Sequence, residues 1–376
     1  MKTIYFDNAA SGGYKPECVK QAVLQALDNP ANPGRSGHRA ALNAAIIVSE
    51  ARENVADFFR TDGDIVFTHN CTAALNFAIF GGLNGGHVVT TAYEHNSVLR
   101  PLDYLKRSGL IDYTVVFPDP SGVIRAEDIH RSLLRNTRMI IINHVSNVTG
   151  ARAPIEEIGR FAYRYGILFL VDAAQSAGHI NINMKDTNIN ILAAAGHKGL
   201  AAPQGVGVLA VSKGIRIRPI IMGGTGSRSE SPLQPLDLPE GLESGTIATP
   251  AIAGLNAGIN WIREHFDEFS KKIRDMTYMM YSELKKIPEV VVYTPWGHFN
   301  GIVTFNIKGL IAGETANILD EQFNICVRPG LHCAPLAHRF LGTLKYGAVR
   351  ASLSYQNTFE EVEIFIDAIK KIVKRF

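Results

Sequence analysis

Short apolar runs alternate with segments of helical periodicity along most of the chain. Residues 38–59 place Ala41, Ala44 and Val48 close to helical spacing, which predicts a helix. Runs rich in Val, Ile and Phe predict strands at 65–67, 87–91, 113–117, 138–143 and 166–171. This alternation is typical of a mostly parallel sheet with helices on both faces.

Two further apolar runs, at 189–194 and 206–211, predict a pair of strands that are joined by a short loop and not by a helix. The loop between them, 196–205, is too short to hold a crossover helix. Parallel neighbours need such a crossover, so we expect this pair to be antiparallel. Lys198 lies in that loop.

The composition changes in the segment 223–243, where Gly, Ser and Pro dominate and predict a long surface loop. A helix is predicted to follow, with Thr249 as its N-cap and Pro250 as its first helical residue, and to continue to about residue 287. We expect this helix to connect two domains.

The C-terminal part predicts a smaller α+β unit. Strands are expected at 290–294, 301–307 and 347–353, and helices at 313–323 and after the capping box Thr358-Phe359-Glu360-Glu361. With the connecting helix, this pattern predicts a large domain at 15–250 and a small domain that combines 1–14 with 251–376.

Composition excludes several classes of protein. The chain has 376 residues, 46% of them hydrophobic, so it can bury a large core. The net charge is only +3 and no run of Lys and Arg occurs, which argues against nucleic acid as a partner. The four cysteines lack CxxC spacing, which favours a reducing compartment over a disulfide framework or a zinc site. Without a secretory leader or an apolar stretch of about 18 residues, we expect a cytoplasmic protein with no membrane segment and no bound metal.

Two residues suggest a cofactor. Asp172 closes the apolar run 167–171, and Lys198 ends the tripeptide Gly196-His197-Lys198. Pyridoxal 5′-phosphate (PLP) needs both residue types, because a lysine amine holds it as a Schiff base and a buried carboxylate keeps its pyridine nitrogen protonated. Taken singly, each has a simpler explanation, since a strand-end Asp often caps a helix and a lysine in a Gly-rich loop is usually solvated.

Further motifs follow one another along the chain. They are Phe6-Asp7-Asn8-Ala9-Ala10, Thr68-His69-Asn70-Cys71-Thr72-Ala73-Ala74-Leu75-Asn76, Glu94-His95-Asn96-Ser97, Ser146-Asn147-Val148-Thr149-Gly150, Val171-Asp172-Ala173-Ala174-Gln175-Ser176, Glu243-Ser244-Gly245-Thr246, Val327-Arg328-Pro329-Gly330-Leu331-His332-Cys333 and Arg350-Ala351-Ser352-Leu353-Ser354. With them the chain resembles the PLP-dependent class V aminotransferase family, and within it the cysteine desulfurase and selenocysteine lyase branch. The resemblance implies the α/β PLP-dependent transferase fold type I, with a mostly parallel seven-stranded sheet and a smaller α+β C-terminal domain.

The resemblance also implies a cofactor site. Lys198 would form the Schiff base, Asp172 would bond the pyridinium nitrogen, Gln175 would lie near the ring hydroxyl, and His95 would stack on the ring and shuttle protons. Phosphate contacts are implied for Cys71 and Thr72 in a turn before a probable helix, for His197 and, across a homodimer, for Gly245 and Thr246.

Substrate and catalytic roles follow from the same resemblance. Arg350, assisted by Asn147, would bind the carboxylate of an amino acid. Cys333 would be the nucleophile that takes sulfur from L-cysteine as a persulfide, leaves L-alanine, and passes the sulfur to an acceptor protein. The alternatives are a selenocysteine lyase, another class V PLP enzyme such as an aminotransferase or lyase in which Cys333 is incidental, and a non-catalytic sulfur-carrier scaffold.

Three positions depart from the family pattern. One is Cys71, which replaces a frequent small or hydroxyl residue, and a turn that binds through backbone N–H groups tolerates it. Ala195 precedes Gly196 where a hydroxyl residue that contacts the phosphate is common, and Gly241 stands where an arginine is frequent. The departures at Ala195 and Gly241 affect the predicted phosphate contacts and the contact with a second subunit.

Overall fold

The computed structural model describes residues 3–29 and 31–375, and its larger sheet matches the predicted one. Seven strands lie in the order β2 (Asp64–Thr68), β8 (Gly207–Val211), β7 (Ile191–Ala195), β6 (Leu168–Asp172), β5 (Thr137–Asn143), β3 (Gly86–Thr91) and β4 (Ile111–Val116). β8 is antiparallel to both β2 and β7, and the other pairs are parallel. The mostly parallel sheet and the antiparallel pair are therefore confirmed.

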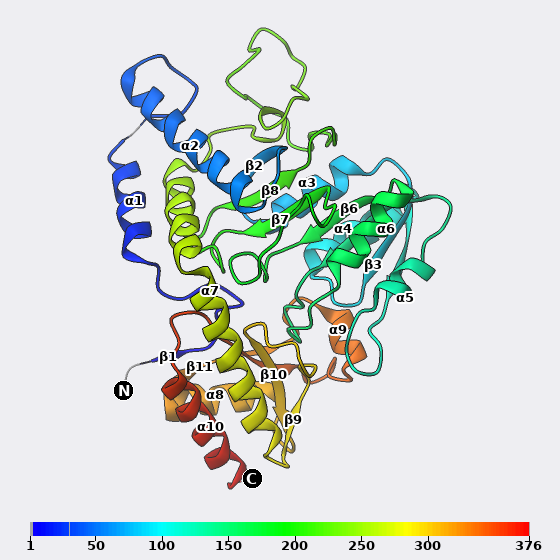
Figure 1. Cartoon of the computed structure of the whole chain (residues 1–376), viewed down its shortest axis with the longest axis vertical. Helices are drawn as coiled ribbons and strands as arrows, with labels where there is room; N and C mark the ends of the chain where they lie inside the picture. The colour runs from blue at the N-terminus through cyan, green and yellow to red at the C-terminus, as the bar shows by residue number, and fades with distance from the viewer. Residues whose placement is uncertain (1–2, 30, 376) are drawn as a thin grey trace.

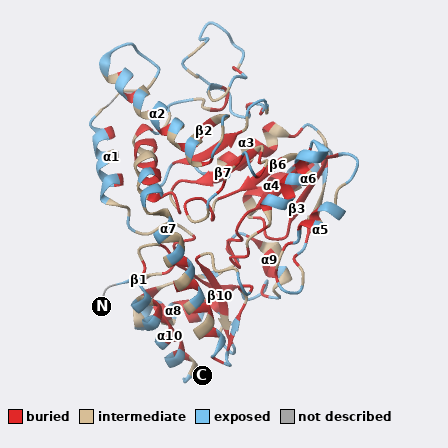
Figure 2. Ribbon diagram, viewed as in Figure 1, coloured by how far each residue is buried: buried red, intermediate tan, exposed pale blue. Residues whose placement is uncertain are grey.

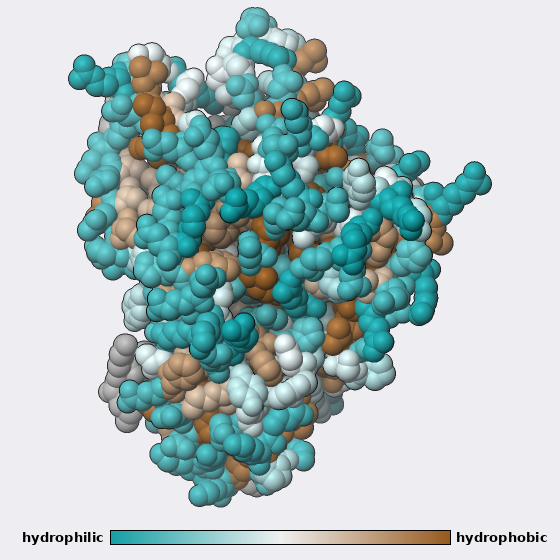
Figure 3. Space-filling view, viewed as in Figure 1, coloured by the Kyte–Doolittle hydropathy of each residue, from teal (hydrophilic) through white to brown (hydrophobic). Residues whose placement is uncertain are grey.

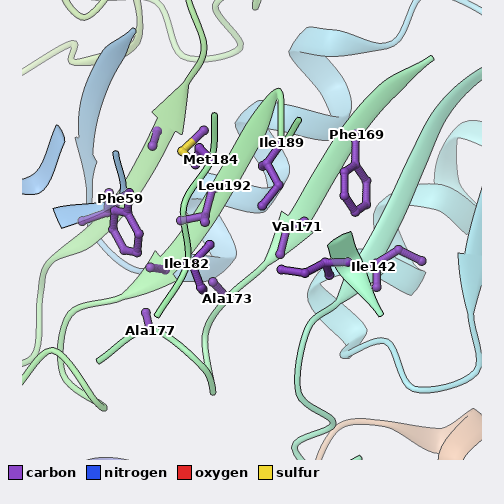
Figure 4. Close-up of a cluster of buried hydrophobic side chains, with 14 of the residues drawn as sticks. Phe59, Ile142, Phe169, Val171, Ala173, Ala177, Ile182, Met184, Ile189 and Leu192 are labelled. Atoms are coloured by element: carbon purple, nitrogen blue, oxygen red, sulfur yellow. The ribbon is translucent and has the colours of Figure 1, made fainter. Parts of the chain in front are cut away.

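Helices cover both faces of this sheet. Successive residues of a strand point to opposite faces, and apolar side chains lie on both faces here, so each face is buried under helices. Ile140 and Ile142 join one apolar cluster, and Met139 and Ile141 join the other. The first cluster is closed by α2 (Arg39–Phe58), α5 (Ala126–Arg131), α6 (Ile155–Tyr165) and the start of α7 (Thr249–Lys285), and the second by α3 (Cys71–Gly82) and α4 (Asn96–Arg107). Figure 4 shows part of the first cluster, and Figure 2 shows the buried strands between helices that are partly exposed.

The long helix α7 connects the two parts of the molecule (Figure 1), and α1 (Glu17–Leu27) packs along it. One detail of the prediction is wrong: Thr249 is the first helical residue and not the N-cap, and Pro250 is the second. The helix starts earlier because the carbonyl of Ala248 already accepts the N–H of Ile252 at 3.0 Å. Thr249 makes no side-chain cap and is buried instead.

A four-stranded antiparallel sheet forms the C-terminal part, in the order β12 (Arg328–Gly330), β13 (Ala348–Ser352), β10 (Ile302–Ile307) and β9 (Val290–Val292). α8 (Ala312–Phe323) and α10 (Phe359–Val373) pack on it. The capping box of α10 is confirmed, since Thr358 Oγ1 accepts the N–H of Glu361 at 3.1 Å. β1 (Ile4–Tyr5) pairs in parallel with β11 (Ile325–Cys326), which places the start of the described chain beside this C-terminal part.

The segment 223–243 is a largely exposed loop, as its composition predicted, and it protrudes at the top of Figure 1. It contains the short 3-10 helix η1 (Glu240–Leu242). Within residues 3–29 and 31–375, no helix is both long enough and apolar enough to cross a membrane.

Candidate active site

A pocket lies at the edge of the larger sheet where its parallel strands have their carboxyl ends. Loops that follow β2, β3, β5, β6 and β7 supply its walls, as is usual for ligand sites in open α/β sheets. The lining residues are Asn70, Cys71, Thr72, Leu75, His95, Ser97, Asn143, Asn147, Asp172, Ala174, Gln175, Ala195, His197 and Lys198. The structure thus brings together all the predicted cofactor residues except Gly245 and Thr246. Asn147, which was predicted to bind substrate, lines the same pocket.

Asp172 ends β6 and is the buried acid of this pocket. Its Oδ1 accepts the N–H of Ala174 at 2.9 Å and lies 3.8 Å from Sγ of Cys71. Burial raises the pKa of Asp172, while the Ala174 N–H and the Lys198 amine lower it. A cation placed against this carboxylate would be stabilised, because an opposite charge offsets the loss of solvent.

Lys198 lies in the loop between β7 and β8, as predicted. Burial lowers the pKa of its amine, while Cys71 and Asp172 act in the opposite direction. A lowered pKa favours the neutral amine, which is the form that attacks a carbonyl to make a Schiff base. The setting of Lys198 therefore suits covalent attachment of an aldehyde.

The N-terminal segment supports this loop from outside the sheet. The carbonyl of His197 accepts the N–H of Gly12 at 3.0 Å and the Nζ of Lys15 at 2.9 Å. Gln175 Nε2 donates to the carbonyl of Ala9 at 2.9 Å. Residues far apart in the sequence therefore hold His197 and Gln175 in place.

His95 precedes α4 and caps it, because its Nδ1 accepts the backbone N–H of Ser97 at 3.0 Å. An accepting Nδ1 places the proton of a neutral ring on Nε2. Burial and the nearby Lys198 lower the pKa of His95 to about 4. His95 therefore presents a neutral imidazole to the pocket at neutral pH.

The start of α3 forms another wall. Asn70 caps this helix, with its Oδ1 accepting the N–H of Ala73 at 2.9 Å. The N–H groups of Cys71 and Thr72 are in the first turn, where they lack intrahelical acceptors and favour an anion. Gly207 of β8 permits the close approach, since a Cβ there would lie 2.4 Å from the carbonyl carbon of Asn70.

Arg350 lies in β13, outside the lining of the pocket, and is 1% exposed. Its Nη2 donates to Asp7 Oδ1 at 2.9 Å and its Nη1 to the carbonyl of Asn147 at 2.9 Å. Its Nε has no partner among the described residues. Burial lowers the pKa of Arg350 to about 10, and Asp7 counteracts this. Arg328 stands directly opposite Arg350 across the β12–β13 pair.

Cys333 is exposed and lies between β12 and α9 (Pro335–Phe340), in the non-helical turn that the sequence indicated. Both His332 (φ 50°) and Cys333 (φ 57°) are in the left-handed region. The N–H of Asn96, the residue after His95, donates to the carbonyl of Cys333 at 2.7 Å. The side-chain amide of Asn147 donates to the carbonyl of His332 at 2.6 Å. Asn147 from the wall of the pocket and Asn96, which lies between two lining residues, therefore hold the turn that carries the cysteine.

Gly245 and Thr246 lie apart from this group. Thr246 Oγ1 is 3.4 Å from Nδ2 of Asn32, and the carbonyl of Gly245 is 3.4 Å from Nη2 of Arg35. Their contact with the phosphate across a homodimer stays a prediction. At Gly241, a Cβ would lie 2.6 Å from the carbonyl oxygen of Pro235, so a larger residue does not fit this loop as it is folded here.

Residues 4–365 match the family model of class V aminotransferases. The chain belongs to the class V aminotransferase family. It is 34% identical to a probable cysteine desulfurase of Methanothermobacter thermautotrophicus, over 98% of this chain and 94% of that protein. A probable cysteine desulfurase of Pyrococcus abyssi is also 34% identical, over 100% of this chain and 95% of that protein. An apo structure of a cysteine desulfurase from Thermococcus onnurineus has a TM-score of 0.92 at 34% identity and covers 100% of this chain and 95% of its own.

Class V aminotransferases depend on PLP, so the predicted cofactor and fold type are confirmed at the level of the family. The pocket of this chain fits that cofactor. It offers a lysine with a lowered pKa for the aldehyde, a buried acid for the pyridine nitrogen and the free N–H groups of a helix start for the phosphate.

Three residues of the site, Asn143, Ser97 and Asp7, have no role predicted from the sequence. Asn143 is the last residue of β5 and lines the pocket, so the strand-end rule that selected Asp172 would also have selected it. The Ser97 hydroxyl lies 2.7 Å from that of Thr72. No local signal indicated that Asp7 would pair with Arg350, because these residues meet only in the folded chain.

Proposed function

We propose that this chain is a cysteine desulfurase, which converts L-cysteine to L-alanine and takes the sulfur onto Cys333. The observation that carries the proposal is the placement of an exposed cysteine next to the PLP pocket, on a turn that is bonded to the residue after His95. An aminotransferase has no use for a nucleophile at this place. The names of the relatives agree with the proposal.

We infer the following roles for the pocket. Lys198 binds the cofactor covalently and exchanges a proton with the substrate Cα, and Asp172 bonds the pyridine nitrogen. Gln175 and His95 contact the ring, and the phosphate is bound by His197, Cys71 and Thr72 and, from a second subunit, by Gly245 and Thr246. When it is bound, PLP supplies an electron sink for the substrate Cα.

Arg350 is proposed to bind the substrate carboxylate, with Asn147. Its Nε is a buried donor without a partner, and Oδ1 of Asn147 is a buried acceptor without one among the described residues. Such groups are expensive unless a ligand completes them. Arg328, across the strand pair from Arg350, adds positive charge on the same side.

The sulfur step needs no outside oxidant. The thiolate of Cys333 attacks the sulfur of the substrate, an S–S bond forms, and the C–S bond breaks with its electron pair left on carbon. That carbon then takes a proton, so the products are L-alanine and a Cys333 persulfide. A thiolate of the acceptor then attacks the outer sulfur of this persulfide, a new S–S bond forms on the acceptor, and the old S–S bond breaks to return Cys333 as a thiolate. We propose that the acceptor is a protein in the cytoplasm.

We also propose that the chain is a homodimer. Leu42, Ile46, Met222, Leu233 and Leu236 are each at least half exposed, with values of 53%, 54%, 67%, 77% and 70%. Figure 3 shows apolar patches near the top of the molecule, over the start of α2 and the protruding loop. Burying such residues against a second copy would remove apolar surface from water. Light scattering should give a dimer, and a monomer that binds PLP at full occupancy would contradict this.

The test of the activity is to incubate the purified, PLP-loaded protein with L-cysteine and a reductant, and to measure alanine and sulfide together. The two products should form in equal amounts. Mass spectrometry without reductant should find one extra sulfur on the peptide that contains Cys333. Formation of pyruvate, or of alanine without sulfide, would reject the proposal.

A further inference from the structure

A chain of hydrogen bonds links two buried histidines beside Cys333. His332 Nε2 lies 3.0 Å from the carbonyl oxygen of Arg328, and His332 Nδ1 lies 3.2 Å from His338 Nε2. His338 Nδ1 in turn lies 2.7 Å from Oγ1 of Thr343. The two rings stack at 22° with centroids 5.4 Å apart. These hydrogen bonds therefore connect β12, the cysteine turn, α9 and the segment after α9.

With both rings neutral, the direction of every hydrogen bond in this series follows from the carbonyl at its end. A carbonyl oxygen can only accept, so the proton of His332 is on Nε2 and its Nδ1 is an acceptor. His338 must then donate from Nε2 and accept at Nδ1, where the Thr343 hydroxyl donates. Burial lowers the pKa of His332 to about 3 and that of His338 to about 4, which keeps both rings neutral at neutral pH.

The turn itself needs such support. His332 and Cys333 are consecutive non-glycine residues whose backbones are in the left-handed region, at φ 50° and 57°. A short segment does not hold two such residues unaided, because each disfavours this conformation. The Asn147 and Asn96 bonds hold the two carbonyl groups. The imidazole of His332 is the third tether, and His338 fixes it.

We propose that His332, His338 and Thr343 form a positioning relay that holds the Cys333 thiol at the pocket for sulfur transfer. The inference rests on the proposed function. A thiol that takes sulfur from a bound substrate and then gives it to a large acceptor has to be exposed, and Cys333 is exposed although its neighbours His332 and Ala334 are buried. An exposed nucleophile cannot be oriented by packing of its own side chain. Its orientation must come from the backbone, which the relay holds, and small misplacements of a reacting group lower rates strongly.

His338→Leu tests the relay, because leucine fills the buried site and removes both hydrogen bonds. In the PLP-loaded enzyme we expect kcat for alanine formation to fall at least about tenfold, with KM for L-cysteine changed less than about threefold. His338→Gln, whose amide can still donate to His332 Nδ1, should recover most of the rate. PLP absorbance should be that of the wild type in both variants.

His87→Leu is the matched control. His87 is also buried and bonds two threonines, with Nδ1 3.0 Å from Thr137 Oγ1 and Nε2 2.9 Å from Thr114 Oγ1, but it lies near the start of β3, away from Cys333. The His87→Leu variant should have a lower thermal midpoint, as His338→Leu does, and an unchanged kcat per bound PLP. Equal losses of kcat in the two variants, or no loss in His338→Leu, would overturn the proposal.

A second readout does not depend on the activity. The alkylation rate of Cys333 by iodoacetamide, divided by that of the exposed Cys18 in the same molecule, should change at least about threefold in His338→Leu and return toward the wild-type ratio in His338→Gln. An unchanged ratio would reject the relay even if the wild type proved inactive with L-cysteine, which would reject only the proposed function. If His338→Leu does not fold, Thr343→Val removes the distal donor alone, and the same ratio should shift in the same direction.

Discussion

The pocket around Lys198 and the turn that carries Cys333 are neighbours, but different parts of the chain build them in different ways. The pocket residues follow the ends of buried parallel strands, so the larger sheet places them, and bonds from the N-terminal segment add support at His197 and Gln175. The cysteine turn lies between β12 and α9, and its bonds to Asn96 and Asn147 reach across to the larger sheet.

The residues proposed to act in the reaction therefore form two groups. Substitutions in the strand-end pocket should change how the cofactor is held. Substitutions on the side of Cys333 and Arg350 should leave the cofactor bound and change the substrate or sulfur steps.

The largest effect is expected for Lys198→Ala. Without this amine the cofactor has no covalent attachment and the substrate Cα has no base, so alanine formation should fall by at least about four orders of magnitude. The absorbance of the lysine-bound cofactor should disappear. Lys15→Ala is the control, because Lys15 is a second, partly buried lysine near the loop, with its pKa lowered by burial to about 8. Attachment that survives in Lys198→Ala and is lost in Lys15→Ala would reverse the assignment.

The next largest effect is expected for Cys333→Ala. The lysine and the cofactor can still labilise the Cα proton, but no thiolate is present to accept sulfur, so alanine formation should fall at least about a hundredfold. PLP binding and its absorbance should be intact, and no persulfide should be found. Cys18→Ala, which removes another exposed cysteine, should behave as the wild type. Turnover of L-cysteine at the wild-type rate by Cys333→Ala would instead favour another PLP chemistry.

Arg350→Gln and Asp7→Asn distinguish substrate binding from a structural ion pair. Both break the 2.9 Å pair, so both should lower the thermal midpoint. Only Arg350→Gln removes the donors for a carboxylate, so it alone should raise KM for L-cysteine at least about tenfold, since charge-assisted bonds contribute about 1.5–3 kcal/mol. Equal KM values in the two variants would leave Arg350 a structural role only.

The smallest effect is expected for Glu94→Gln, beneath the pocket. Oε1 of Glu94 accepts the Thr91 hydroxyl at 2.8 Å and the Asn143 N–H at 2.9 Å, and burial raises the pKa of this carboxyl from 4.5 to about 8. The folded state therefore binds this proton more tightly than the unfolded state does. Its stabilising effect is complete below the unfolded pKa and is lost as the pH rises through the folded one.

Between these two pH values the unfolding free energy of the wild type should fall by up to about 1.4 kcal/mol per pH unit. Glu94→Gln, which resembles the protonated acid, should flatten that slope in urea titrations from pH 5 to 8. Glu157→Gln, an exposed glutamate, should keep it. A wild-type slope that Glu94→Gln does not change would show that Glu94 is ionised in the folded protein.

The strands of the larger sheet and two residues of the cofactor pocket, Asp172 and Lys198, are predictable from the residues of the sequence. The period of the apolar runs predicted the strands, and the short loop 196–205 predicted the antiparallel pair. Asp172 and Lys198 were selected by residue type and position, whereas His95 and Gln175 came only from the family resemblance. All four line one pocket, because the ends of parallel strands gather at one edge of a sheet.

The contacts that hold Cys333 and Arg350 form only when the chain is folded. The Asp7–Arg350 pair, the relay of His332, His338 and Thr343, and the bonds from Asn96 and Asn147 join segments whose local sequences carry no sign of one another. Hydrogen bonds and ion pairs of this kind form only when the distance between two groups on separate elements is correct to within a few tenths of an ångström. Hydrophobic periodicity specifies which face of an element is buried, and it does not specify which polar group on another element it will meet.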